Sequence, residues 1–493
     1  MDLSAQLPAL IVIAPLLAAP LCVLIGNPRL AWGVALLTSV FCFAAALGLL
    51  QMLQHVDVLS YSMGGWAPPL GIELRIDALG ALLLLLLGGS SVVVTLFALR
   101  SVEHEVALER QALFYTALML VLAGLIGITV TGDIFNIFVF LEISSLSTYA
   151  LISLGRDRRA LFASFRYLVM GTIGATFILI GIGFMYVMTG TLNLQDLAER
   201  LPAVADTRAI RAAFAFLTIG LGLKAAMFPL HIWLPNAYAY SPSVVSAFLA
   251  STATKVAIYV LVRVLLSLYG AHFSLGELPF DKLLLVLGSV GIVAGSLVAI
   301  FQSNVKRMLA YSSIAQVGYI LLAIGLASQP GFTAALLHLF NHAIIKGSLF
   351  LALGVVSFRF TGAKLADMAG LGKTMPWTMA AFVVGGLSLI GVPATAGFIS
   401  KWYLVIALID ASLWPLAILV LFGSLLAVVY IGRVIEVAYY RQPARDLPRK
   451  QIPITMVGSL WLLTLGNVYF GLNTEFSLGL VSLAVSSLMG VGV

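Results

Sequence analysis

The chain has few charged residues and almost no cysteine. Only 10% of its 493 residues are Asp, Glu, Lys or Arg, and 61% are hydrophobic, whereas soluble domains carry roughly 25% charged residues. This composition excludes a soluble protein and indicates a membrane protein. The two cysteines, Cys22 and Cys42, lie in apolar runs, which excludes a disulfide framework, an iron–sulfur cluster and a zinc site. We interpret both as packing residues, and we expect no cofactor and no enzyme chemistry.

Long apolar runs fill most of the sequence. A helix needs about 20 apolar residues to cross a hydrocarbon core of roughly 30 Å, and charge clusters, glycines and prolines separate fourteen such runs. The expected spans are 8–26, 31–53, 78–99, 112–131, 133–154, 163–189, 211–233, 242–268, 282–302, 308–327, 330–356, 376–409, 412–440 and 451–471. The sequence thus predicts an all-α polytopic membrane protein with about 14 transmembrane helices. The apolar tail after Asn473 is either a short further span or an interfacial segment.

Basic residues are divided unevenly between alternate connections. The set of connections that starts with the one holding Arg29 contains 16 Lys and Arg residues, among them Arg445, Arg449 and Lys450, and the other set contains five. Because inner loops carry the excess of basic residues, this asymmetry predicts a multi-pass protein of the cell inner (plasma) membrane with both termini on the outer side. The net charge of +7 is then explained by the basic residues of the inner loops, which set the orientation of the protein in the membrane. We therefore expect no nucleic-acid partner.

Six basic residues fall inside the expected spans, and two of them lie near span ends. Arg263 and Arg433 are these two, and from such positions a long side chain can reach the lipid headgroups. Arg433 and Glu436 are also three residues apart on one helix face, a spacing that allows an ion pair. We interpret both arginines as structural.

Four lysines lie deeper in the membrane: Lys224, Lys255, Lys346 and Lys401. Each lysine near a helix centre costs about 2.5–3.5 kcal/mol on insertion scales, so these residues must face protein or water. Only one carboxylate, Glu142, lies at a comparable depth. With one acid for four bases, some of the lysines are expected to spend time neutral. A lysine that alternates between a charged and a neutral form can carry a proton.

Three titratable residues follow one face of the eleventh span. His338, His342 and Lys346 are spaced four residues apart, which places them along one helical stripe. Imidazoles titrate near neutral pH and can relay protons. Two alternatives stay open, hydrogen-bonded core histidines and a metal site. Because a metal would need at least one further ligand, and none is nearby in the sequence, we predict no metal.

Proline interrupts two of the expected spans. The seventh span carries Lys224 before Pro229 and Pro235, and the twelfth carries Pro393 before Lys401. Proline breaks the backbone hydrogen-bond ladder, and interrupted helices in matching positions of two halves indicate an inverted-repeat transporter. We expect helices 1–3 in residues 1–110, two inverted five-helix repeats in residues 111–270 (helices 4–8) and 271–440 (helices 9–13), and helix 14 with a tail in residues 441–493. Helices 7 and 12 are the discontinuous ones.

Several motifs, taken in order, resemble those of a known family. They are the runs Thr131–Glu142, Lys224–Pro235, Ser251–Lys255, Lys306–Ser313, His338–Lys346 and Phe398–Trp402. The family consists of the antiporter-like membrane subunits of respiratory complex I, membrane-bound hydrogenases and multisubunit Mrp-type cation/proton antiporters. The run that ends at Glu142 looks most like the D-type subunit of the Mrp antiporters. The resemblance covers about residues 70–440.

The resemblance implies roles for the buried residues. Glu142 and Lys224 correspond to the interacting acid and base of spans five and seven, Lys255 to the lysine of span eight, His342 and Lys346 to the central link on span eleven, and Lys401 to the terminal base of span twelve. We expect protons to load the span-eight lysine and the histidine stripe, which includes His338, and to leave through the terminal base. The pairing of the acid and the base would gate this loading.

The function expected from these features is proton translocation in a multisubunit monovalent cation/proton (Na⁺/H⁺) antiporter, together with other membrane subunits. The alternative is a proton-pumping subunit of a redox-driven complex, either complex I or a membrane-bound hydrogenase. A single-chain solute carrier is a third class, but the buried polar residues here are mainly titratable. A weak sodium candidate is the set of oxygens on Thr131, Asp133 and Asn136, because Na⁺ prefers hard oxygen ligands. Exchanged sodium could instead pass through a partner subunit.

Overall fold

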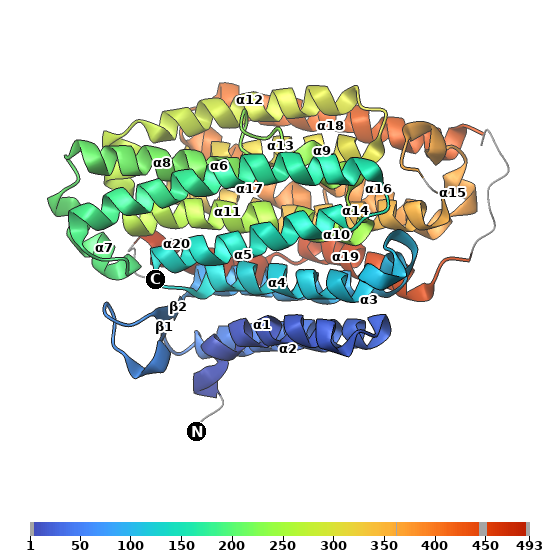
Figure 1. Ribbon diagram of the computed structural model, residues 1–493. Helices are drawn as coiled ribbons and strands as arrows, with labels where there is room; N and C mark the ends of the chain where they lie inside the picture. Colours follow the sequence, from blue (N-terminus) through green and yellow to red (C-terminus); the bar gives the residue numbers. More distant parts are fainter. Residues whose placement is uncertain (1–3, 361, 443–450, 490–493) are drawn as a thin grey trace.

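The computed structural model describes residues 4–360, 362–442 and 451–489. In this part of the chain, long helices run roughly side by side in one bundle (Figure 1). Twelve helices are long and apolar enough to cross a membrane, so the prediction of an all-α membrane protein is confirmed. Arg445, Arg449 and Lys450, which contributed to the charge asymmetry, lie outside the described residues.

The elements up to the middle of the chain are η1 (Ser4–Gln6), α1 (Leu7–Ile25), α2 (Pro28–Met52), β1 (Leu59–Ser62), η2 (Met63–Gly65), β2 (Glu73–Ile76), α3 (Ala78–Glu105), η3 (Leu108–Arg110), α4 (Gln111–Val130), α5 (Ile134–Ser153), α6 (Arg158–Thr189), α7 (Leu194–Arg200), η4 (Leu201–Ala203), α8 (Arg208–Lys224), α9 (Leu234–Tyr240), α10 (Ser243–Ser251), α11 (Ala253–Val262), η5 (Arg263–Leu268) and η6 (His272–Glu277). Strands β1 and β2 form an antiparallel hairpin in the long connection between α2 and α3. Hydropathy did not predict this hairpin.

The remaining elements are α12 (Phe280–Ile300), α13 (Val305–Ile324), α14 (Gln329–Arg359), η7 (Leu365–Met368), α15 (Leu371–Thr374), α16 (Pro376–Ile390), α17 (Ala396–Asp410), α18 (Trp414–Tyr440), α19 (Ile454–Leu472) and α20 (Glu475–Met489). The apolar tail after Asn473 forms α20, whose 15 residues are fewer than the roughly 20 needed for a straight crossing. This helix packs against α3 and α14.

Two of the fourteen predicted spans are interrupted, as expected from their prolines. The seventh, predicted at 211–233, contains α8 and a non-helical segment that leads to α9 beyond its predicted end, and the twelfth consists of α16 and α17. Gly391 ends α16 with a φ of 93°, a left-handed conformation that costs glycine little. Pro393, which has no N–H to continue a helix, follows in the gap before α17. The other twelve predicted spans correspond to the twelve membrane-length helices, with boundaries shifted by a few residues.

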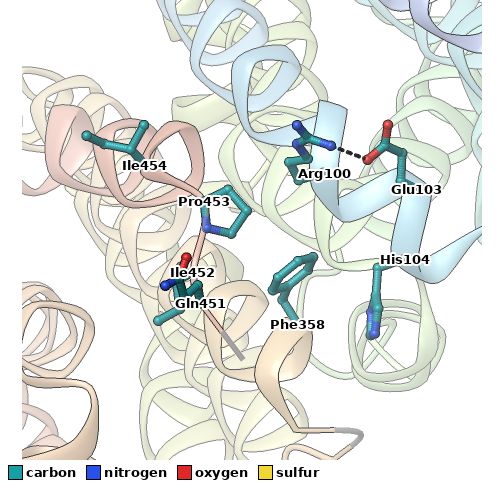
Figure 2. Close-up of a pocket in the computed structure, with 8 residues that line it drawn as sticks. All are labelled: Arg100, Glu103, His104, Phe358, Gln451, Ile452, Pro453 and Ile454. Atoms are coloured by element: carbon teal, nitrogen blue, oxygen red, sulfur yellow. Dashed lines mark hydrogen bonds and ion pairs between the residues drawn. The ribbon is translucent and has the colours of Figure 1, made fainter. Parts of the chain in front are cut away.

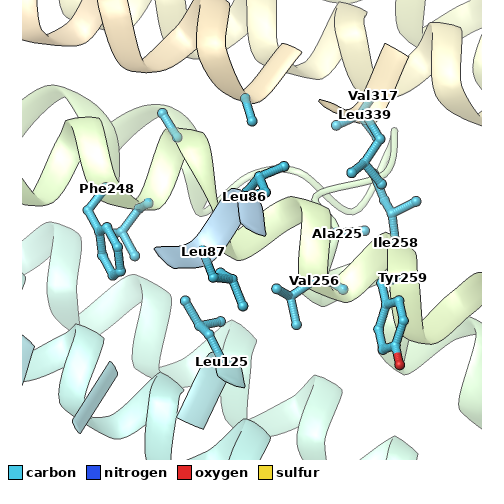
Figure 3. Close-up of a cluster of buried hydrophobic side chains, with 14 of the residues drawn as sticks. Leu86, Leu87, Leu125, Ala225, Phe248, Val256, Ile258, Tyr259, Val317 and Leu339 are labelled. Carbon is cyan, nitrogen blue, oxygen red and sulfur yellow. The ribbon is translucent and has the colours of Figure 1, made fainter. Parts of the chain in front are cut away.

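Burial identifies the centre of the bundle. In the most apolar windows of Ser243–Leu268 and of α14, 94% of residues are buried, against 39% for α6, α12 and α18. A helix that is apolar on every side belongs in a core. The core includes Leu86 and Leu87 of α3, Leu125 of α4 and Phe248 of α10 (Figure 3). Since Lys255 and Lys346 lie on the most buried segments, their burial follows from the packing of this centre.

Small residues allow some helices to approach closely. A Cβ atom added to Gly288 of α12 would lie 2.7 Å from the carbonyl oxygen of Gly318 on α13. Between membrane helices, where the hydrophobic effect adds little, such close backbone contact provides much of the packing energy. The α12–α13 pair is therefore a tightly packed unit beside the central α14.

Connections predicted for opposite membrane faces gather at opposite ends of the bundle. Single backbone bridges join Leu74 with Thr131 and Asp133 with Asn193 at one end, and Val106 with Gly155 and Asn304 with Lys364 at the other. The first end holds connections of the set poor in basic residues, and we refer to it as the outer end. The second holds connections of the basic set, and we refer to it as the inner end.

Candidate functional site

The structure brings Glu142 and Lys224 into contact. Glu142 lies in the middle of α5, and Lys224 is the last residue of α8, where the seventh span breaks. The Lys224 Nζ atom lies 3.2 Å from Oε1 of Glu142 and donates a second hydrogen bond of 2.8 Å to Oγ of Ser145. The lysine side chain is only 6% exposed, whereas the glutamate is 24% exposed. The pair therefore connects the protein interior with the surface of this chain.

Lys255 lies next to a second irregularity of the backbone, between α10 and α11. Its Nζ atom donates to the carbonyl oxygen of Ala250 and lies 3.5 Å from Oγ1 of Thr254. A small cavity of about 30 Å³ separates Lys224 from α11, and Ser145 and Val256 line it. A space of this size can hold one water molecule. The cavity leaves room for one water molecule between Lys224 and α11, the helix that carries Lys255.

Lys346 occupies the central helix α14 and is fully buried. Its Nζ atom donates hydrogen bonds to the carbonyl oxygen of Leu309, at 2.8 Å, and to Oγ of Ser312, at 2.5 Å. Both partners belong to α13, and neither is a carboxylate. Because neutral oxygens compensate a buried ammonium less completely than a carboxylate does, this site does not favour permanent charge.

The two histidines of α14 stack on each other but differ in their partners. Their ring centroids are 6.1 Å apart. His338 is hydrogen-bonded through Nδ1 to Ser400, at 2.8 Å, and through Nε2 to Gln316, at 2.9 Å. Both ring nitrogens of His342 are buried without a hydrogen-bond partner among the described residues. The hypothesis of a hydrogen-bonded core histidine thus fits His338 alone. In the described part of the chain, no three His, Cys, Asp or Glu residues gather as a metal would require.

Lys401 lies where the twelfth span is broken. Its Nζ atom donates to the carbonyl oxygens of Leu389 and Ile390, at 3.0 and 2.9 Å, and to Oγ of Ser424, at 2.9 Å. These two carbonyls belong to the last turn of α16, where a helix leaves acceptors unpaired and its dipole is negative. The ammonium group also lies 4.7 Å from the ring centroid of Tyr319. The break in the helix therefore creates the binding place for the amine.

These groups form a row through the middle of the bundle. Lys401 contacts the Tyr319 ring, whose centroid lies 5.7 Å from that of His338. Beyond His338, the His342 imidazole is within electrostatic reach of Lys255 and Lys346. Every residue of the predicted proton path therefore lies either in this row or, for Glu142 and Lys224, beside it.

Two of the three proposed sodium ligands, Thr131 and Asp133, accept local backbone hydrogen bonds. Oδ1 of Asp133 accepts the N–H of Asn136 and so caps α5, and Oγ1 of Thr131 accepts the N–H of Asp133. Burial raises the pKa of Asp133, which disfavours the charged form that a cation needs. These contacts identify the three residues as the start of a helix.

The contacts expected of the two span-end arginines need correction, because both side chains bind other groups of the protein. Arg263 does not reach the headgroups, because both of its terminal nitrogens bond the carboxylate of Asp77, at 2.6 and 2.5 Å. Although burial opposes ionisation, the Arg263 guanidinium holds the pKa of Asp77 below its usual range. The predicted pair of Arg433 with Glu436 is also wrong. Arg433 donates to the carbonyl oxygen of Ile300, and Glu436 bonds Arg441.

Sequence reasoning missed a buried polar group at the inner end. Lys306, which counted as a loop residue, is 5% exposed and donates to Oγ of Ser243, at 3.0 Å. The backbone N–H and the hydroxyl of Ser243 both donate to Oε2 of Glu105. A cavity of about 320 Å³ at the inner end reaches Lys306 and Glu105. The Lys306–Ser313 motif was the only signal that could have drawn attention to it.

A larger cavity of about 540 Å³ lies apart from the row of amines. It is formed at the inner end between α3 and the start of α19, and its lining includes the ion pair of Arg100 and Glu103 (Figure 2). None of the deep lysines lines it. Its size therefore does not make it part of the candidate site.

Comparison with known proteins places the chain in one family. The family described as NADH:quinone oxidoreductase/Mrp antiporter, transmembrane, matches residues 131–427. The N subunit of the NADH-quinone oxidoreductase of Desulforudis audaxviator is 42% identical over 492 residues, which cover 96% of this chain and 97% of the relative. The D-type subunit of the Na⁺/H⁺ antiporter of Bacillus subtilis is 29% identical and covers 90% and 88%.

A solved structure agrees with this assignment. A chain in the structure of the Mrp complex from Dietzia superposes with a TM-score of 0.90 at 26% identity, over 99% of this chain and 98% of that one. The motifs, the fold and the family match lead to one conclusion. The chain belongs to the family of antiporter-like membrane subunits that NADH:quinone oxidoreductases and Mrp antiporters share.

Proposed function

We propose that the chain is a proton-translocating subunit of a multisubunit membrane complex. The observation that supports this most strongly is the buried row of titratable side chains from Lys255 through Lys346, His342 and His338 to Lys401. Amines and imidazoles at this depth are costly and have a use as proton carriers. The chain itself would transfer ions and perform no catalytic reaction.

The Glu142–Lys224 pair acts as the gate of the row. While the two side chains are in contact, the carboxylate stabilises the charged amine. When they separate, Lys224 can give its proton toward Lys255 by way of the small cavity between Lys224 and α11. Since the groups influence one another, they titrate as a coupled set, and no single residue has a pKa of its own.

The end of the row at Lys401 provides the outlet. This amine is bound by backbone carbonyls at a break of the helix, and small shifts of the two half-helices change its distance to those carbonyls. Broken helices in corresponding places of two repeats are typical of secondary transporters. We propose the repeat boundaries given by the sequence, with α8–α9 and α16–α17 as corresponding elements.

We propose that the complex is a monovalent cation/proton antiporter of the Mrp type, in the cell inner membrane, with both termini of this chain on the outer side. The near-complete structural match to a chain of an Mrp complex supports this choice. The second candidate is a redox-driven proton pump, which is favoured by the 42% identity to the N subunit of an NADH-quinone oxidoreductase. Affinity purification of the native complex decides between them: small antiporter subunits support the first, and iron–sulfur or hydrogenase subunits support the second.

The gate is tested with Glu142→Gln and Lys224→Met in the native complex, reconstituted into vesicles that contain a pH-sensitive dye. Both variants should lose at least about tenfold of driven proton flux, a conservative bound below the roughly 100-fold that a proton-transfer residue typically contributes, while assembling normally. Lys282→Met, at an exposed position of the outer end, is the matched control and should keep its flux. Full flux in both gate variants would refute the proposal.

A further inference from the structure

A stripe of three residues connects Lys255 with the outer end of the bundle. Lys255 and Tyr259 lie on α11, and Arg263 follows at the start of η5. They are spaced four residues apart, so they share one face of the segment. Each step rises by about 6 Å along a helix. Lys255, a member of the proton path proposed above, is therefore one turn from Tyr259 and two turns from Arg263.

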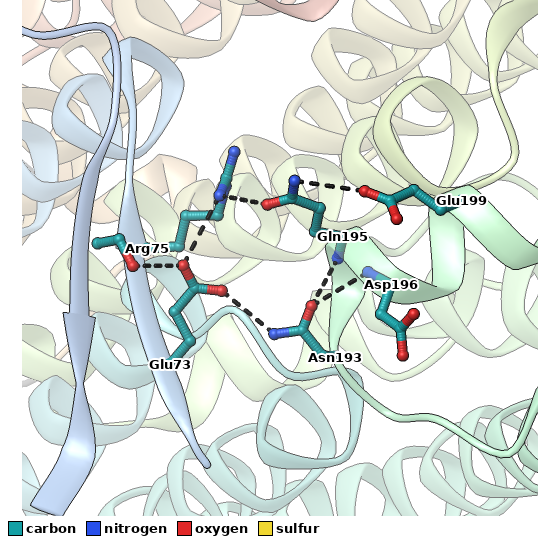
Figure 4. Close-up of polar contacts among 7 residues, drawn as sticks. Glu73, Arg75, Asn193, Gln195, Asp196 and Glu199 are labelled. Carbon is teal, nitrogen blue, oxygen red and sulfur yellow. Dashed lines mark hydrogen bonds and ion pairs between the residues drawn. The ribbon is translucent and has the colours of Figure 1, made fainter. Parts of the chain in front are cut away.

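A cavity of about 360 Å³ approaches this stripe from the outer end. Its lining includes Tyr259 and Arg263 at the bottom, and Arg75 and the exposed Gln195 near the surface. Above it, Glu73, Arg75, Asn193 and Gln195 form a polar network that ties β2 to the start of α7 (Figure 4). This network holds the rim of the cavity in place. The bottom of the cavity lies one helical turn from Lys255, the first amine of the proton row.

The groups at the bottom of the cavity are poor proton relays. The Tyr259 hydroxyl donates its hydrogen to the carbonyl oxygen of Thr129, at 2.8 Å, and accepts Nε–H of Arg263, at 3.1 Å. A relay must pass a proton on to the next group, and a backbone carbonyl has no proton to pass. An arginine stays protonated in proteins and accepts nothing. A proton that reaches the bottom of the cavity is therefore not carried on to Lys255 by Tyr259 or by Arg263.

The ion pair keeps these groups in place. Arg263 binds Asp77 with two parallel hydrogen bonds, a geometry that fixes orientation as well as adding energy. Oδ1 of Asp77 also accepts the N–H of Gly80 and so caps α3. Both side chains are nearly buried, at 14% and 11% exposure. The arginine is thus anchored to the N-terminus of a buried helix, and this contact keeps its side chain at the bottom of the cavity.

We propose that Asp77, Tyr259 and Arg263 form an outer seal, which prevents protons of the outer compartment from reaching Lys255 directly. The seal makes access to the proton row asymmetric. Lys255 can receive a proton from within the membrane or from the inner end, but it cannot exchange protons directly with the outer compartment. This role rests on the proposed function and adds to it, since a pump or antiporter loses its stored gradient if a loading residue is open to both sides.

The test measures passive proton leak in vesicles that hold the native complex, with no driving cation or reductant. A potassium gradient clamped by valinomycin fixes the membrane potential, and acid is added on the side of the outer end. In Asp77→Asn/Arg263→Gln both charges are removed, so no unpaired buried charge destabilises the fold. We expect the leak of this variant to exceed that of the wild type by at least about tenfold.

Two further variants make the test specific. Arg75→Gln, which alters the same cavity near the surface, should stay as tight as the wild type. Adding Lys255→Met to the double variant should abolish its leak, because the leaking protons pass through that amine.

The outcomes separate the seal from the proposed function. A tight double variant in a complex whose wild type moves protons when driven would overturn the seal, and so would a leak that persists without Lys255. A wild-type complex that moves no protons when driven would overturn the proposed function itself.

Discussion

At the scale of single residues, the two histidines of α14 have opposite surroundings. His338 is bonded on both ring nitrogens, to Ser400 of α17 and Gln316 of α13, so it joins three helices. His342, one turn away and fully buried, has no hydrogen-bond partner among the described residues. An imidazole with two free nitrogens is suited to pass a proton, whereas a doubly bonded one also holds the structure together.

We predict that His342→Ala reduces driven proton flux by roughly 100-fold, a typical contribution of a proton-transfer residue, with little change in thermal stability. His338→Ala should reduce the flux and also lower the unfolding temperature, because it leaves Gln316 without its histidine partner. Flux and unfolding temperature of the purified complex check both. His272→Ala, at an exposed site, is the control. Equal stability losses in the two α14 variants would contradict this distinction.

At the scale of elements, the break of the twelfth span is stabilised by a helix outside both predicted repeats. Asn467 of α19 accepts a hydrogen bond from Ser388 of α16, at 3.1 Å, and donates one to Ser348 of α14, at 3.2 Å. Ser388 in turn accepts the N–H of Gly397, at 3.1 Å, in the first turn of α17. One amide therefore holds both sides of the gap that binds Lys401.

We predict that Asn467→Leu destabilises the protein by about 1–3 kcal/mol, because the buried Ser388 hydroxyl loses its acceptor and the Ser348 hydroxyl loses a donor, and that it lowers proton flux by disturbing the carbonyls around Lys401. Thr464→Val is the matched control on the same helix, since within the described residues the buried Thr464 hydroxyl bonds only the carbonyl oxygen of Leu460 in its own helix. Thermal unfolding and flux measurements compare the two. If the two variants behave alike, α19 does not hold the break.

The sequence allowed the elements to be predicted better than the contacts between them. Hydropathy gave fourteen spans because each needs only a local apolar run, and Pro229 and Pro393 marked the breaks because proline acts on its own helix. The pairing of Glu142 with Lys224 came from the family resemblance. The bond between Asp77 and Arg263 joins residues 186 positions apart, and no local pattern indicates which distant helix faces which. For the same reason the burial of Lys306, which was counted as a loop residue, was not predicted.

At the scale of the whole molecule, the two ends of the bundle correspond to the two sets of connections separated by basic charge. This arrangement permits a direct test of sidedness, because Cys22 and Cys42 are both fully buried. A thiol introduced on the surface would therefore be the reactive one.

We predict that Asp206→Cys, whose native side chain is 95% exposed at the outer end, reacts with a membrane-impermeant maleimide on intact cells. Lys373→Cys, at an exposed site of the inner end, should react only after the membrane is opened. The unmodified chain is the control and should not react in either case. Labelling in the reverse order would invert the proposed orientation.

The candidate proton path contains four lysine amines, Lys224, Lys255, Lys346 and Lys401, but one carboxylate, Glu142, and this imbalance limits the number of protons it can hold. Each proton held in the row raises the electrostatic cost of holding another. Only a few of these groups can therefore be protonated at the same time. A further proton can then be accepted only as an earlier one departs. Proton uptake on one side of the membrane and proton release on the other would then be coupled by this repulsion. No large domain movement would be needed to synchronise them.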